Sequence, residues 1–205
     1  MLKQLIGIVA AVALGIGGAW LAVNYTQKPQ EAGVLGEQNL PEGGDFTLQS
    51  VDGDVHLSDF RGKVVVLYFG YTACPDICPT SMATLKGALN QMSATELQQV
   101  QGVFVSIDPA RDTLAHVQEY AQYFHANMRG ITGAPDVVQA VAKRYGVFFR
   151  KVEMAGSAMA YSMDHSSNLY VIDQNGRLRE MVAHGTAPNE LATVLRRYLT
   201  TKDAS

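Results

Sequence analysis

The chain contains two cysteines, and both lie in one short segment. Cys74 and Cys78 are separated by three residues in GYTACPDICP, residues 70–79. Thiolates bind soft metal ions and carry out thiol–disulfide chemistry, so the pair indicates one of these two activities. His165, far downstream in the segment DHSS (164–167), adds an imidazole that could join the thiolates.

The cysteine pair allows three interpretations. A structural disulfide is the least favoured, because a domain of this size does not need a covalent staple. A redox dithiol usually has two intervening residues, whereas this pair has three. A metal site is slightly preferred: two thiolates and one imidazole form a good trigonal set for Cu(I), while Zn²⁺ would require a fourth ligand.

Proline constrains how this segment enters the next helix. Pro79 disfavours helical dihedral angles at Cys78, so we expect Cys78 to cap a helix whose first position is Pro79. A thiol at that cap would face free backbone N–H groups and the positive end of the helix dipole. The sequence therefore predicts a lowered pKa for Cys78, with Cys74 folded back toward the same point.

Several polar and sulfur-containing residues could support this site. Asp164 could orient the imidazole of His165 or be a solvated loop carboxylate, and the sequence favours neither. Tyr71 could shield the site, although a packed aromatic is the plainer interpretation. Asp108, with Arg111 and Asp112, is expected to organise a loop. The thioethers of the loop before His165 could assist metal entry, but adaptable apolar packing is favoured for them: Met154, Met159 and Met163.

The elements that position these residues follow from the hydrophobic pattern. Residues 64–69 form a continuous apolar run, typical of a strand covered on both faces. A hairpin is expected over 45–57, further strands over 101–107, 147–153, 167–172 and 177–183, and helices over 79–92, 113–124, 134–145 and 186–199. This order predicts an α/β fold with a mixed sheet and helices on both faces. The Cys74 loop would lie beyond the carboxyl end of its strand, where functional groups gather.

The N-terminus has a different composition. Residues 5–23 carry no charge and would span roughly 28 Å as a helix, which suits a single transmembrane anchor over residues 1–23. A cleaved signal peptide is the alternative, but the exit of this run is a poor cleavage site. Residues 24–44 read as a flexible tether, 45–199 as the globular domain and 200–205 as a tail. The net charge of −3 gives no basic patch for nucleic acid.

Three motifs together resemble the Sco/SenC family of copper-binding cytochrome c oxidase assembly proteins. They are FGYTACPDICP (69–79), VSIDPARDT (105–113) and DHSS (164–167), and the start of the domain, DFTL (45–48), also agrees. The resemblance implies a thioredoxin-like fold that binds one copper ion per chain through Cys74, Cys78 and His165. It also implies that the family delivers copper to the dinuclear centre of oxidase subunit II, or keeps the cysteines of that subunit reduced.

The resemblance sets further expectations for partners and location. A copper donor and a thioredoxin-like reductant would serve the site, since an oxidised pair loses two ligands. The soluble domain would face the periplasm from the inner membrane of a bacterium, because the leader is not Arg-rich like a transit peptide. Copper transfer by ligand exchange is the favoured function. A membrane-anchored thiol–disulfide oxidoreductase is the main alternative, and the sequence does not separate the two.

Overall fold

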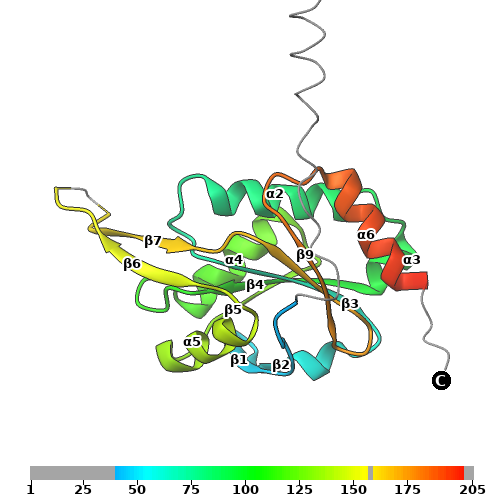
Figure 1. The fold of residues 1–205 in the computed structure, drawn as a ribbon, viewed down its shortest axis with the longest axis horizontal. Helices are drawn as coiled ribbons and strands as arrows, with labels where there is room; N and C mark the ends of the chain where they lie inside the picture. The colour runs from blue at the N-terminus through cyan, green and yellow to red at the C-terminus, as the bar shows by residue number, and fades with distance from the viewer. Residues whose placement is uncertain (1–39, 157–158, 201–205) are drawn as a thin grey trace, which may run out of the picture. The chain divides into compact units, whose positions relative to one another are not determined.

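The computed structural model describes residues 40–156 and 159–200, which share a central five-stranded mixed sheet (Figure 1). Its strand order is β5-β4-β3-β8-β9. Strands β3, β4 and β5 are parallel, and β8 and β9 are antiparallel to their neighbours. The bounds are β3 (Val64–Gly70), β4 (Val100–Ser106), β5 (Met128–Ile131), β8 (Leu169–Ile172) and β9 (Leu178–Val182).

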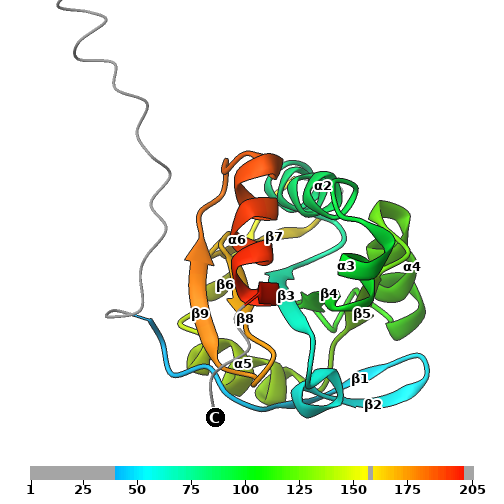
Figure 2. The same ribbon diagram turned by 90° about the vertical axis from the view of Figure 1, so that its right-hand side faces the viewer.

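Helices cover both faces of this sheet. Every residue of β3 is buried, because α2 (Ile77–Leu89) and α6 (Pro188–Thr200) pack on one side and α5 (Pro135–Arg144) lies on the other (Figures 1 and 2). Helix α4 (Leu114–Phe124) packs against β5. The contact is backbone to backbone: a Cβ on Gly130 would lie 2.2 Å from the carbonyl oxygen of Val117.

The remaining elements lie around this core. A hairpin of β1 (Thr47–Ser50) and β2 (Gly53–His56) leads into the 3₁₀ helix η2 (Leu57–Phe60), and the short helix α3 (Ala94–Gln98) precedes β4. Strands β6 (Phe149–Glu153) and β7 (Tyr161–His165) form a separate antiparallel hairpin. Figure 1 shows this hairpin projecting away from the central sheet.

Most of the predicted architecture is confirmed, although several short elements were not predicted. The mixed sheet and its covered central strand agree with expectation. The hydrophobic pattern did not predict η2, α3 or β5, which are all short. The segment before His165 was also expected to be a loop, whereas that segment is strand β7.

Much of the predicted end segments lies outside the described residues: the anchor (1–23), residues 24–39 of the tether and residues 201–205 of the tail. The last part of the predicted tether is in contact with the domain: Gly43 donates a backbone hydrogen bond to Arg144, and the hydroxyl of Tyr145 donates to the carbonyl of Gly44. Within 40–156 and 159–200, no helix has the length and apolar character needed to span a bilayer.

Candidate metal centre

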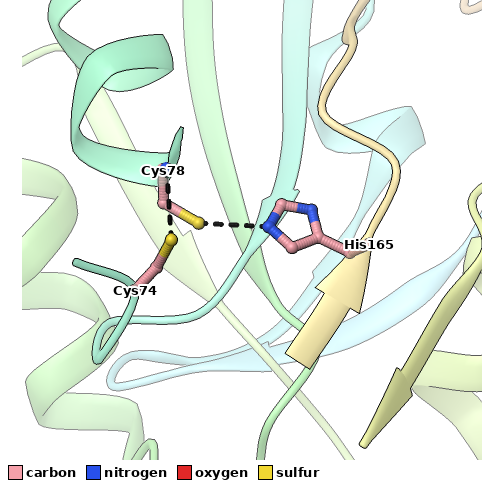
Figure 3. A group of neighbouring side chains, drawn as sticks. All are labelled: Cys74, Cys78 and His165. Carbon is pink, nitrogen blue, oxygen red and sulfur yellow. Dashed lines mark hydrogen bonds between the residues drawn. The ribbon is translucent and has the colours of Figure 1, made fainter. Parts of the chain in front are cut away.

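Two sulfurs and one imidazole converge at the carboxyl end of β3. Cys74 comes from the loop after β3, Cys78 from the first turn of α2 and His165 from the last position of β7 (Figure 3). Their ligand atoms all lie within 4.8 Å of one another, and Cys78 Sγ is 3.3 Å from His165 Nε2. The three residues that the motifs singled out are therefore neighbours in space, although Cys78 and His165 are 87 positions apart in the sequence.

The local structure of Cys78 differs from the prediction. Helix α2 begins at Ile77 with Asp76 as its cap, so Cys78 occupies the second helical position. The prediction that Cys78 caps the helix is wrong. Pro79 then occupies the third helical position. Proline is tolerated there because the backbone N–H groups of the whole first turn have no partner within the helix. One of these groups, the N–H of Cys78, donates to Cys74 Sγ over 3.4 Å.

The pKa shifts of the two thiols are opposite in direction. The pKa of Cys74 lies far below its usual value because its sulfur accepts hydrogen bonds, first from the Cys78 thiol and also from the backbone N–H groups of Asp76 and Cys78. The pKa of Cys78 is raised, since its thiol donates to Cys74 and is fully buried. The lowered pKa predicted for Cys78 is wrong, and the effect of the helix N-terminus falls on Cys74.

The imidazole is oriented by a backbone carbonyl. His165 Nδ1 lies 2.8 Å from the carbonyl oxygen of Ser166, and because a carbonyl only accepts, Nδ1–H is the donor. Nε2 then faces the sulfurs and would supply its lone pair to a metal ion bound there. Asp164 does not have the orienting role considered for it. Adjacent residues of a strand point to opposite sides, and Asp164 forms an exposed cross-strand ion pair with Arg150 at 2.9 Å.

Aromatic rings and a glycine pack around the three donors. Tyr68 and Tyr71 are buried and meet the imidazole of His165 edge to face, at 6.2 and 5.9 Å between ring centroids. Tyr71 is thus a packed aromatic that also covers the site. Gly70 makes room for sulfur, since a Cβ there would lie 2.9 Å from Cys78 Sγ. The thiol side of the site is therefore built into the core.

The loop after β4 holds the cysteine loop from the other side. Asp112, which is buried, accepts a 2.6 Å hydrogen bond from the Thr72 hydroxyl and a 3.1 Å bond from the Thr72 N–H. The hydroxyl of Ser106, the last residue of β4, also donates to Asp112 at 2.6 Å. Thr72 lies two residues before Cys74, so this contact fixes the start of the cysteine loop.

The same loop also holds the hairpin that carries His165. Arg111 donates from Nη1 to the carbonyl oxygens of Tyr161 at 2.9 Å and Met159 at 3.3 Å, and its guanidinium lies 3.7 Å from the centroid of the Tyr161 ring. Asp108 accepts from Arg111 Nε and from the Tyr161 hydroxyl at 2.8 Å. We call Asp108, Arg111 and Tyr161 the hairpin clamp. Asp108 and Arg111, which were expected to organise a loop, contact the hairpin and not the three donors.

A groove of about 470 Å³ opens onto the metal-ligating atoms. Cys74 and His165 both line it. The rest of its wall comes from the start of α2 and from the β6–β7 hairpin, and includes Ile77, Met154, Met159 and Met163. The groove gives the partly exposed Cys74 an approach from solvent, whereas Cys78 is fully buried.

Three contributors to the site were not predicted from the sequence. Thr72, Tyr161 and the carbonyl of Ser166 act through contacts that no spacing rule reveals, although Thr72 and Ser166 lie inside the motifs. The other histidines have local partners outside the cluster, as His184 does with the Ser81 hydroxyl at 2.9 Å. Among the described residues, the only group with metal-ligating geometry is Cys74, Cys78 and His165.

Comparisons with known proteins agree with this geometry. The chain is 33% identical over 193 residues to a SCO2-like protein of Rickettsia conorii, covering 92% of this chain and 94% of the relative. The solution structure of apo Sco1 from Thermus thermophilus is similar with a TM-score of 0.72 and 35% identity, over 80% of this chain and 95% of that one. The crystal structure of Arabidopsis thaliana ScoI with copper bound has a TM-score of 0.70 and 34% identity, over 77% and 97% of the two chains.

The likeness extends through the whole described domain. The expected thioredoxin-like fold is confirmed by these structures, which share the mixed sheet and its helices. The model of the SCO1/SenC family matches residues 36–200, a range that contains all three motifs and every residue of the metal centre. The chain therefore belongs to the SCO1/SenC family.

Proposed function

We propose that this protein binds one Cu(I) ion through Cys74, Cys78 and His165 and passes it to cytochrome c oxidase during assembly. The carrying observation is the convergence of the three ligand atoms within 4.8 Å. A relative of the same fold has been solved with copper bound, which supports copper as the metal. The role of the Sco family in cytochrome c oxidase assembly supports the oxidase as the destination.

The donor set fits a soft monovalent ion. Two sulfurs and one imidazole favour copper over the hard ions Mg²⁺ and Ca²⁺, and three protein donors fall short of the four that a structural zinc site uses. An ion about 2.3 Å from sulfur can bridge donors that lie about 4 Å apart, so the site needs at most small side-chain rotations. Cys74 is already disposed toward the thiolate state, and Nε2 of His165 presents its lone pair.

Transfer would proceed by exchange of ligands. Cys74 is reached from the groove, so an incoming thiolate of the acceptor can approach the ion beside it while buried Cys78 still holds it. Low coordination leaves room for that extra ligand. We propose oxidase subunit II as the acceptor, and a membrane anchor over residues 1–23 that confines the domain to the periplasmic face of the inner membrane. Such confinement raises the effective concentration of donor relative to acceptor.

The test is Cu(I) binding by the reduced full chain, measured by competition with a chelator of known affinity. We expect one tightly bound equivalent, and at least tenfold weaker binding by His165→Ala, because one of three ligands is lost. His56→Ala is the matched control, since His56 is bonded to Thr47 in the β1–β2 hairpin, away from the cluster. Equal affinities of the wild type and His165→Ala would refute the proposed site.

A second function is favoured by the asymmetry of the two thiols. Cys74 is partly exposed with a lowered pKa, and Cys78 is buried with a raised one, as in a dithiol with one attacking and one resolving cysteine. Cys74 thiolate would attack a disulfide of the partner and release one partner thiolate. Cys78 would then attack Cys74 Sγ, release the second thiolate and leave a Cys74–Cys78 disulfide that a thioredoxin-like protein must reduce.

His165 separates the two functions. Dithiol exchange needs both cysteines but no imidazole. If His165→Ala supports oxidase assembly as well as the wild type while binding Cu(I) poorly, thiol reduction is the physiological role. Loss of assembly in parallel with loss of copper affinity supports copper transfer.

A further inference from the structure

Three methionines face the groove that leads to the metal centre. Met154, Met159 and Met163 all line it, together with Cys74 and His165. The sequence alone favoured simple apolar packing for these side chains. The structure adds that all three, Met163 on β7 and the other two in the segment between β6 and β7, line the same open groove as Cys74 and His165.

The hairpin fixes how these residues are placed. Met163 lies two positions before His165 on β7, so both residues are on the same face of the strand. Met154 follows the last residue of β6, and its N–H donates to the carbonyl of Ala160 at 2.8 Å. This bond brings the two sides of the hairpin together and places Met154 close in space to Met159, which is next to Ala160 in sequence.

Burial differs among the three. Met163 is partly buried against the core. Met154 is 40% exposed, which makes it one of the few large apolar side chains at the surface of the described domain. A polar side chain would suit that exposed position equally well. The feature that the three residues share is sulfur, and thioether sulfur is a soft, neutral ligand for Cu(I).

We propose that Met154, Met159 and Met163 form a second, weaker site for Cu(I) in this groove, through which the ion enters or leaves the main centre. The inference rests on the proposed copper-binding function. Thioethers remain neutral and cannot match the affinity of a thiolate, so an ion bound there moves downhill to Cys74 and Cys78. The neutral donor set also selects a monovalent soft ion, because the charge of Zn²⁺ would not be compensated.

The experiment titrates Ag(I), a redox-inert soft monovalent ion, into the reduced full chain labelled with ¹³C at the methionine methyl groups. The first equivalent should fill the main centre, which the His165 ring nitrogen signals report. A second equivalent should then shift the methyl signals of Met154, Met159 and Met163. The buried methionines are internal controls whose signals should not move: Met82, Met92, Met128 and Met181.

The matched variants remove sulfur without changing apolar bulk. The triple substitution Met154→Leu, Met159→Leu, Met163→Leu should abolish the second binding phase, keep the first and slow Cu(I) uptake from a donor about tenfold. Met181→Leu should change neither phase. The subsite is refuted if the second equivalent leaves the three signals unmoved, or if all methionines shift alike, which would mean adventitious binding only. Failure of the first equivalent to bind would instead refute the main centre.

Discussion

The hairpin clamp predicts that Arg111 controls the metal site without touching it. Arg111→Lys keeps the positive charge beside Asp108 but loses the stack on Tyr161 and at least one of the two bonds to hairpin carbonyls. A charge-assisted hydrogen bond contributes about 1.5–3 kcal/mol and a cation–π contact about 0.5–2 kcal/mol. Because the Arg111 side chain is 24% exposed, we take a net loss of about 2 kcal/mol for docking of the hairpin.

The weaker docking of the hairpin should lower Cu(I) affinity through His165. The imidazole is carried by β7, so it is available to the ion only while the hairpin is docked. A loss of 2 kcal/mol corresponds to roughly 30-fold, which is the upper limit for the fall in Cu(I) affinity. The fall should also not exceed that of His165→Ala, because the two cysteines belong to the core and not to the hairpin.

The assay is a double-mutant cycle on Cu(I) affinity, with urea unfolding of the reduced apo chain in parallel. Arg111→Lys should lower affinity in the wild type and have no effect when His165 is already alanine. Arg150→Lys is the matched control on the same hairpin: its ion pair with Asp164 is exposed on both sides, so we expect a change below about 0.5 kcal/mol. An unchanged affinity in Arg111→Lys, or an equal effect in the His165→Ala background, would refute the reasoning.

Three further predictions concern the thiols and the core. Cys78→Ser should destabilise the reduced apo protein by about 1–3 kcal/mol in urea unfolding, because it buries a hydroxyl, whereas Cys74→Ser should be nearly neutral; equal losses would contradict this. Since the pKa of Cys74 is lowered, its thiolate persists below the pH at which an ordinary thiol is protonated. Iodoacetamide should therefore modify Cys74 at a rate that hardly falls between pH 8 and pH 6, and a tenfold fall per pH unit would show an ordinary thiol. Gly130→Ala should cost about 3 kcal/mol of stability, because its Cβ would overlap the carbonyl oxygen of Val117, yet leave Cu(I) affinity unchanged.

The parts of the fold that could be predicted are those that local pattern specifies. A continuous apolar run predicted β3, and apolar residues at helical spacing predicted α2, α4, α5 and α6. Strand β5 was not predicted because MRGI is only four residues long. Its glycine is required by the close approach of α4, which is a tertiary contact that the local sequence does not show. Strand β7 escaped because YSMDH mixes polar and apolar residues, as a strand outside the core can.

The candidate site divides in the same way. The metal ligands could be predicted because ligand chemistry depends on residue type: two cysteines and one histidine in specific motifs were sufficient to identify them. The lowered pKa was assigned to Cys78 instead of Cys74 because the assignment depends on where α2 begins. With the helix beginning at Ile77, the sulfur of Cys74 accepts from the Cys78 thiol and, with a smaller effect, from the backbone N–H of Cys78, and its pKa is lowered. A shift of two residues in a helix start is below what sequence patterns resolve.

The two halves of the site differ in how they are held, and this difference bears on transfer. The cysteine half is fixed by core packing around Cys78 and by the bonds of Asp112 to Thr72. The histidine half is fixed by polar contacts of the hairpin clamp, at a hairpin outside the central sheet. Polar contacts at a partly exposed position are individually weaker than burial in the core, so the hairpin is the half that a docking partner can displace at low cost. Release should therefore begin when the imidazole of His165 leaves the ion. The ion would stay bound to the two cysteine sulfurs until the acceptor supplies its own ligands.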